Sequence, residues 1–106
     1  MKTDQDFQKM INGLSGDYLD KVLKTVEKLI KENNIQNIYE ESHKLKGSGK
    51  TYGFVKISDI SSEVEELCKQ LLDKKEEHIK KNKNIIIKKI KQLKCLTKDY
   101  QKLNIK

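Results

Sequence analysis

The sequence contains no proline and no tryptophan, and its five glycines all lie between positions 13 and 53. Proline and glycine are the residues that most often interrupt helices, so the second half of the chain has no strong helix breaker. No apolar run approaches the roughly 18 residues needed to cross a bilayer, and the N-terminus has no signal-peptide hydrophobic region. At 106 residues the chain is long enough to form one domain with its own hydrophobic core. We therefore expect a single cytoplasmic domain over residues 1–106.

Cysteine is also scarce, since Cys68 and Cys95 are the only two and their spacing matches no metal site. Without an export signal, both are expected to be reduced thiols. Cys68 is in phase with Val64 and Leu71, which predicts that it lies in the core as a small hydrophobic residue. No metal-ligating set is expected, because His78 stands alone among lysines and glutamates.

Charge, by contrast, is plentiful: 23 basic and 16 acidic residues give a formal net charge of +7. A lysine-rich surface is compatible with nucleic acid, an acidic membrane or an acidic protein. The few aromatic residues are scattered rather than interleaved with the lysines, and no zinc-finger or RNA-binding signature is present. We therefore predict no nucleic-acid and no membrane partner, and interpret the basic run over 80–94 as a solvated helix face. A basic helical nucleic-acid-binding module stays open as an alternative.

Apolar residues recur three and four positions apart through most of the chain, which is typical of amphipathic helices. The pattern predicts a short first helix over 7–14, ended by Gly13 and the pair Ser15–Gly16, and longer helices over 19–30, 35–52, 57–71 and 79–103. Gly53 suits the left-handed position after a helix end, with Phe54 packing back on the last turn.

The fold class indicated by this pattern is all-α, an up-down four-helix bundle with a short additional N-terminal helix. The lysine- and asparagine-rich stretch 74–84 is predicted to be a mobile helix–helix turn. We expect a monomer, because each apolar stripe can be buried within one bundle.

The helix predicted over 35–52 carries the residues with chemical potential. Its buried stripe passes through Leu45 and Gly49, and His43 lies one step off that stripe, with one side toward water. Lys46 brings an ammonium group one turn later, and Gly47 leaves the same patch free of a side chain. A glycine inside a helix costs about 1 kcal/mol relative to alanine. Two glycines beside one histidine therefore indicate close approach of another surface.

A family resemblance is carried by the run His43-Lys44-Leu45-Lys46-Gly47-Ser48, followed by Tyr52-Gly53-Phe54. This motif resembles the signature of histidine-containing phosphotransfer (HPt) domains of two-component phosphorelays, with some likeness to the phosphotransfer domain of chemotaxis histidine kinases. The resemblance spans roughly residues 15–100 as a helix pattern and 42–68 as a motif. It implies a phosphocarrier, rather than an enzyme, that accepts a phosphoryl group from a receiver-domain aspartate or a kinase and passes it to another receiver domain.

The resemblance also implies roles for individual residues. His43 would be the phosphoryl acceptor, Lys46 would offset phosphoryl charge, and Glu65 would orient the His43 ring, as a glutamate does in the chemotaxis relatives. The residues implied to bind the partner are Lys44, Gly47, Ser48 and Lys50. The expected partners are response-regulator receiver domains and a (hybrid) histidine kinase, and no cofactor is expected because Mg²⁺ would belong to the receiver.

Three competing interpretations bear on this motif. The run Gly47-Ser48-Gly49-Lys50-Thr51 is similar to the end of a P-loop, but Lys44 stands where that pattern requires a glycine, so we reject a nucleotide-binding loop. A degenerate bundle of the same family, acting only as a scaffold or inhibitor of a histidine kinase, stays open. Glu65 could also be an ordinary exposed glutamate, since Glu63 and Glu66 flank it.

Overall fold

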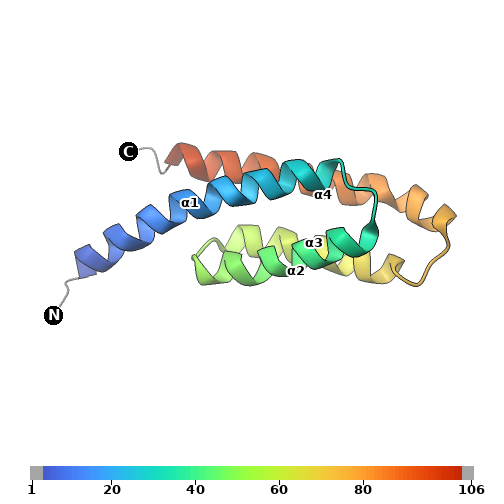
Figure 1. Cartoon of the computed structure of the whole chain (residues 1–106), viewed down its shortest axis with the longest axis horizontal. Helices are drawn as coiled ribbons and strands as arrows, with labels where there is room; N and C mark the ends of the chain where they lie inside the picture. The colour runs from blue at the N-terminus through green and yellow to red at the C-terminus, as the bar shows by residue number, and fades with distance from the viewer. Residues whose placement is uncertain (1–3, 104–106) are drawn as a thin grey trace.

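The computed structural model describes residues 4–103, with side chains from Gly16 onward except that of Glu76. Over residues 4–103 the chain forms four helices: α1 (Asp4–Ile30), α2 (Ile35–Thr51), α3 (Val55–Leu71) and α4 (Glu76–Leu103). They run alternately up and down, so the start of α1, the α2–α3 turn and the end of α4 lie toward the same end (Figure 1). The predicted up-down four-helix bundle is confirmed.

The prediction of a separate short N-terminal helix is wrong. Helix α1 continues from Asp4 through Gly13 and Gly16 to Ile30 without interruption. Each glycine costs only about 1 kcal/mol in a helix interior and keeps its N–H, so the hydrogen-bond ladder continues where a proline would break it. The apolar residues predicted for that first helix lie outside the described side chains.

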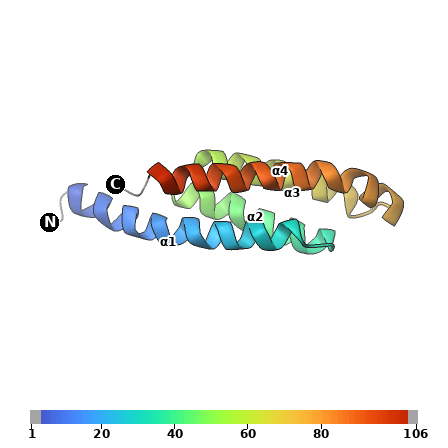
Figure 2. The same cartoon turned by 90° about the horizontal axis from the view of Figure 1, so that it is seen from above.

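The helices do not contact one another equally. Helix α2 packs mainly against α3, whereas α4 packs against both α1 and α3. The views from the front and from above both show α1 and α4 running side by side along the bundle (Figures 1 and 2). Helices α2 and α3 therefore form a hairpin that is one half of the molecule, and α4 covers the side of that hairpin formed by α3.

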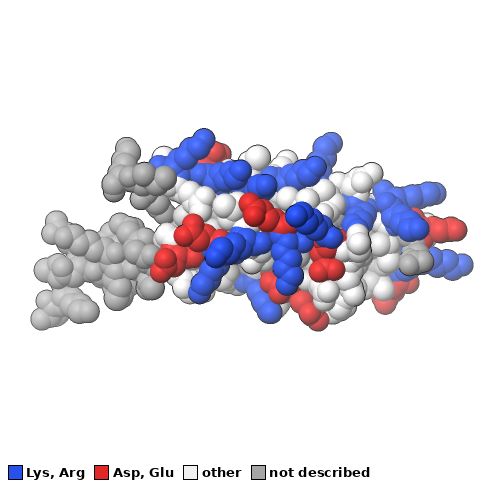
Figure 3. All heavy atoms as spheres, turned by 45° about the horizontal axis from the view of Figure 1, so that its top comes forward, with Lys and Arg blue, Asp and Glu red and all other residues white. Residues whose placement is uncertain are grey.

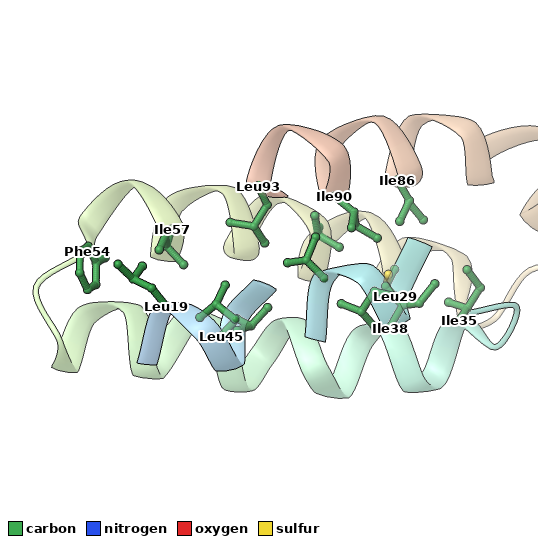
Figure 4. Close-up of a cluster of buried hydrophobic side chains, with 14 of the residues drawn as sticks. Leu19, Leu29, Ile35, Ile38, Leu45, Phe54, Ile57, Ile86, Ile90 and Leu93 are labelled. Carbon is green, nitrogen blue, oxygen red and sulfur yellow. The ribbon is translucent and has the colours of Figure 1, made fainter. Parts of the chain in front are cut away.

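The core lies between all four helices, and Figure 4 shows its aliphatic side chains pointing inward from each of them. Burying one such side chain contributes roughly 1.5–3 kcal/mol, so this cluster is the main source of stability. Cys68 is fully buried within it, as predicted, and burial raises the pKa of its thiol to about 12. The largest fully buried side chains are Leu19, Val22, Val26, Leu29, Ile38, Ile57, Val64, Ile86, Ile90 and Leu93.

The stretch 74–84 is mostly helical, which corrects its prediction as a turn. Helix α4 begins at Glu76, so only residues 72–75 connect it to α3. Lysine and glutamate are good helix formers even where few apolar residues mark the helical period. Over the described residues, no helix is long and apolar enough to cross a membrane.

Candidate functional site

Both ends of α2 are fixed by local hydrogen bonds. At the N-terminus, the side-chain oxygen of Asn34 accepts from the backbone N–H groups of Gln36 and Asn37. At the C-terminus, Gly53 adopts a left-handed φ of 82°, and the Phe54 N–H donates to the Gly49 carbonyl at 2.7 Å. This arrangement is a Schellman motif, and it confirms the role predicted for Gly53.

His43 lies midway along α2 with 67% of its side chain exposed, and its Nδ1 is 3.2 Å from Oε1 of Glu65 on α3. The two residues are 22 positions apart in sequence and meet because α2 and α3 form an antiparallel hairpin. Glu65 is only 14% exposed. The structure thus places the carboxylate beside the ring, as the resemblance implied, and Glu65 is not a freely solvated glutamate.

The charge state of Glu65 determines which atom donates in this contact. Burial opposes its ionisation, but the hydrogen bond from His43 and the nearby positive charge of Lys46 outweigh burial and hold the pKa of the carboxyl below its ordinary value of 4.5. An ionised carboxylate can only accept, so Nδ1 of His43 must be the donor. In the neutral ring, Nε2 then keeps its lone pair, and it has no hydrogen-bond partner among the described residues.

Lys46 binds the second oxygen of the same carboxylate. Its Nζ lies 3.4 Å from Oε2 of Glu65, an oxygen that is shut off from solvent and has no shorter partner among the described residues. That separation is an ion pair rather than a short hydrogen bond. Glu65 therefore joins the imidazole and the ammonium group, and the three predicted catalytic residues form one cluster.

Three of the four predicted partner-binding residues are exposed near His43. Lys44 is 73% exposed and forms only a long pair with Glu41 at 3.6 Å. Lys50 and Gly47 are exposed, and a Cβ built on Gly47 would have no neighbour within 4 Å. This side of α2 is therefore open to an approaching surface.

Ser48 does not lie with them. Its hydroxyl is 2.8 Å from the Tyr18 hydroxyl of α1, and it also contacts the Leu45 carbonyl at 3.4 Å. The Tyr18 ring stacks on Tyr52 with centroids 4.4 Å apart, and burial raises the pKa of the Tyr18 hydroxyl. Ser48 thus links α2 to α1, and a role in partner binding stays a prediction that this contact does not support.

The sequence did not reveal the contribution of Ser58. This buried residue at the start of α3 donates its hydroxyl to the backbone carbonyl of Lys46 at 2.8 Å. The one available signal was its spacing, because Ser58 precedes Glu65 by seven residues and so lies on the same helix face. Among the described residues, no group of three or more histidine, cysteine or acidic side chains could hold a metal ion.

A comparison with protein families places this geometry in context. The family model described as Hpt domain matches residues 15–101. The chain belongs to the Hpt domain family. Comparisons with curated proteins and with solved structures gave no match.

Hpt domains are helical bundles that carry phosphoryl groups on histidine in phosphorelays, and they interact with receiver domains and histidine kinases. They are phosphocarrier modules rather than classical enzymes. In this Hpt domain, the exposed His43 has Nδ1 in contact with Glu65 and no hydrogen-bond partner for Nε2 among the described residues, so its surroundings fit that chemistry. The other histidine, His78, forms no side-chain hydrogen bond or ion pair with the described residues.

Proposed function

We propose that this Hpt domain is a phosphorelay intermediate that accepts a phosphoryl group on Nε2 of His43. The donor would be the aspartyl phosphate of a receiver domain, or a histidine kinase, and the final acceptor the aspartate of another receiver. One observation carries the proposal: an exposed imidazole donates from Nδ1 to a mostly buried, ionised carboxylate. That bond favours the tautomer in which Nε2 is a nucleophile.

In the transfer step, the Nε2 lone pair attacks phosphorus in line with the bond to the aspartate oxygen. The N–P bond forms as the O–P bond breaks, and the aspartate leaves as a carboxylate. Nδ1 keeps its proton, so the phosphorylated ring is cationic beside Glu65, whose negative charge stabilises it. Return to another aspartate reverses these bond changes, and neither direction requires a general base from this chain.

Lys46 supplies positive charge next to the acceptor. With 35% of its side chain exposed and its Nζ 3.4 Å from Oε2 of Glu65, the ammonium group belongs to the cluster that contacts the His43 ring and is partly open to solvent. Phosphoryl transfer depends chiefly on positioning and on neutralising charge at the transferred oxygens. The rest of the machinery, the aspartate and a bound Mg²⁺, would come from the receiver, so we propose no cofactor for this chain.

Docking of the receiver would use the exposed face of α2. Lys44 and Lys50 flank the open surface at Gly47, and acidic groups surround the phosphorylated aspartate of the expected partner. Charges at the rim of an interface mainly accelerate association and contribute less to final affinity. We therefore propose that these two lysines act on the encounter rate.

The decisive experiment is transfer of radiolabel from a phosphorylated receiver domain to this protein, with His43→Gln as the test variant and His78→Gln as its matched control. The expected result is label on the wild type and on His78→Gln, lost in acid and stable in base, and none on His43→Gln. Label retained by His43→Gln would contradict the assignment of the acceptor.

A folded wild type that takes no label from several receivers or from kinases would contradict phosphotransfer itself. In that case the scaffold or inhibitor function would be favoured, because the bundle and its docking face would persist without chemistry. Circular dichroism on the same samples would establish that the helices are intact.

A further inference from the structure

Helix α3 contacts Lys46 twice, once at its backbone carbonyl and once at its side-chain ammonium group. The Ser58 hydroxyl donates to the Lys46 backbone carbonyl at 2.8 Å, and Oε2 of Glu65 lies 3.4 Å from the Lys46 Nζ. Seven residues make nearly two helical turns, so Ser58 and Glu65 occupy the same face of α3. The Ser58 contact fixes the backbone of α2, and the Glu65 contact fixes the side chain of Lys46. The rotation of α2 about its axis is thereby set against α3.

Gly49 sets the separation of the same two helices. A Cβ at this position would lie 2.9 Å from the Ser58 backbone nitrogen and 3.2 Å from both the Phe54 carbonyl oxygen and the Ser58 Cα. These are backbone atoms, so no rotamer change can make room. Gly47, two residues earlier, would meet nothing within 4 Å. The two glycines therefore have different roles: one faces the open surface, and the other lets α3 approach.

The geometry at His43 leaves little tolerance for a wider separation. The Nδ1–Oε1 distance of 3.2 Å is already at the long end for an N–H···O hydrogen bond. An alanine at position 49 needs roughly half an ångström of additional space before its Cβ reaches ordinary contact with the Ser58 nitrogen at 2.9 Å. A shift of that size across the α2–α3 interface exceeds the margin of the bond to Glu65.

We propose that Gly49 and Ser58 are positioning residues for phosphotransfer, which fix the separation and rotation of α2 against α3 and thereby hold Glu65 on Nδ1 of His43. This inference rests on the proposed function, because the proton on Nδ1 matters only if Nε2 is the nucleophile. When the bond to Glu65 is lost, the imidazole proton is no longer confined to Nδ1. A ring protonated at Nε2 has no lone pair there and cannot attack phosphorus.

Two readouts test the proposal on the full chain. The first is the ¹⁵N chemical shifts of the His43 ring, which report the nitrogen that carries the proton and require no phosphotransfer. The second is the rate of label transfer from a phosphorylated receiver. The test variants are Gly49→Ala and Ser58→Ala. The matched control is Gly16→Ala, a mid-helix glycine on α1 where an added Cβ would meet nothing within 4 Å.

Gly49→Ala is expected to raise the Nε2–H fraction of His43 and to slow transfer about tenfold, by analogy with the loss of activity when the hydrogen-bond partner of a metal-ligating histidine is removed. Ser58→Ala is expected to shift both readouts in the same direction by about threefold, because the helix ladder still satisfies the Lys46 carbonyl. Ser58→Cys, which keeps a weak donor, should restore part of the loss. Gly16→Ala should change neither readout.

A wild-type tautomer ratio and transfer rate in Gly49→Ala would overturn the proposal. If Gly49→Ala fails to fold, as seen by circular dichroism, the serine variants decide: an unchanged tautomer ratio in Ser58→Ala would overturn it equally. A wild type that takes no label would contradict the proposed function, whereas the tautomer comparison would still decide the positioning role.

Discussion

Helices α2 and α3 bury several small residues, whereas most of the described buried residues of α4 are large and aliphatic. Besides their aliphatic residues, α2 and α3 enclose Ser42, Gly49, Ser58 and Ser61. Among the described side chains of α4, the buried ones are Ile86, Ile90, Leu93 and Thr97, and the Thr97 hydroxyl donates within its own helix to the Leu93 carbonyl. Small residues bring two backbones close enough for short side chains to bond across, whereas large ones supply burial. One half of the bundle, α2 and α3, positions the site and also contributes to the core, whereas α4, in the other half, contributes burial.

The same two regions differ in charge. Residues 35–51 and 55–71 together carry five lysines and six acidic residues, whereas residues 76–103 carry nine lysines and three acidic residues. Almost all of the chain's net charge of +7 is therefore in α4, which packs on α1 and α3 rather than on the helix that bears His43. In the view of Figure 3, lysines are spread along the length of the molecule and interspersed with acidic side chains. Net charge and the candidate site are thus separate features of the molecule.

The largest expected effect comes from weakening the stabilising half. Ile90→Ala removes most of a fully buried side chain and should lower the free energy of unfolding by about 2–5 kcal/mol. The transfer rate per folded molecule should stay at the wild-type value. Urea denaturation measures the first quantity, and Ile85→Ala, at a position 49% exposed, is the control with a change within about 0.5 kcal/mol. A slow but fully stable Ile90→Ala would contradict the division of roles.

Weakening the positioning half should instead affect the transfer rate more than the free energy of unfolding. Glu65→Ala removes the acceptor for the His43 Nδ1 proton and is expected to slow phosphotransfer about ten- to hundredfold. Glu65→Gln should recover part of the rate, because its amide oxygen can still accept from Nδ1. Label transfer with Glu66→Gln as the control measures this, and a wild-type rate in Glu65→Ala would exclude an orienting role for Glu65.

The pH dependence of the free energy of unfolding should show how much the Glu65 carboxylate of the positioning half contributes to stability. A carboxyl whose pKa is lowered in the folded state stabilises the protein above its unfolded-state pKa, and this contribution is lost as pH falls through the folded-state value. Since the pKa of Glu65 lies below 4.5, wild type should lose more unfolding free energy than Glu65→Gln as pH falls from about 5 to about 3. Parallel urea titrations of both proteins measure this difference, and identical pH profiles would argue against a contribution from the cluster.

The smallest effect is expected from the lysines of α4. Replacing Lys88, Lys91 and Lys98 by glutamine should change the transfer rate less than about twofold at physiological salt, because exposed charges far from an interface are screened. Replacing Lys44 and Lys50 should slow association more, and most at low salt. A mobility shift of duplex DNA by wild type that survives 200 mM salt and is lost in the triple variant would instead favour a nucleic-acid-binding role.

The helical spacing was sufficient to predict the bundle and the helix end at Gly53, because burial of a continuous apolar stripe dominates the choice of secondary structure. It was insufficient at Ser15–Gly16 and over 74–84, where the expected turns lie largely within helices. Glycine and asparagine are weak interruptions, and neighbouring helix formers with intact N–H groups override them. A proline at either place would have made the signal decisive.

The candidate site was predictable in its residues but not in all of its contacts. The motif located His43, Lys46 and Glu65, and the structure brings these three together. Ser48 is five residues after His43, which rotates it about 140° around the helix, and this signal was present in the sequence. The Ser58 bond was not predictable, because it depends on how α2 is rotated against α3, and periodicity within one helix does not fix that rotation.

The two contacts of Lys46 have a consequence for the number of residues between Ser58 and Glu65. Ser58 and Glu65 reach the same residue because a fixed count of seven positions separates them on one helix face. A single residue inserted or deleted between them would turn the carboxylate about 100° around α3 while the serine stayed in place. The stretch from 58 to 65 is thus a molecular ruler: its composition can vary at exposed positions, whereas its length cannot change by one residue without separating the carboxylate from His43.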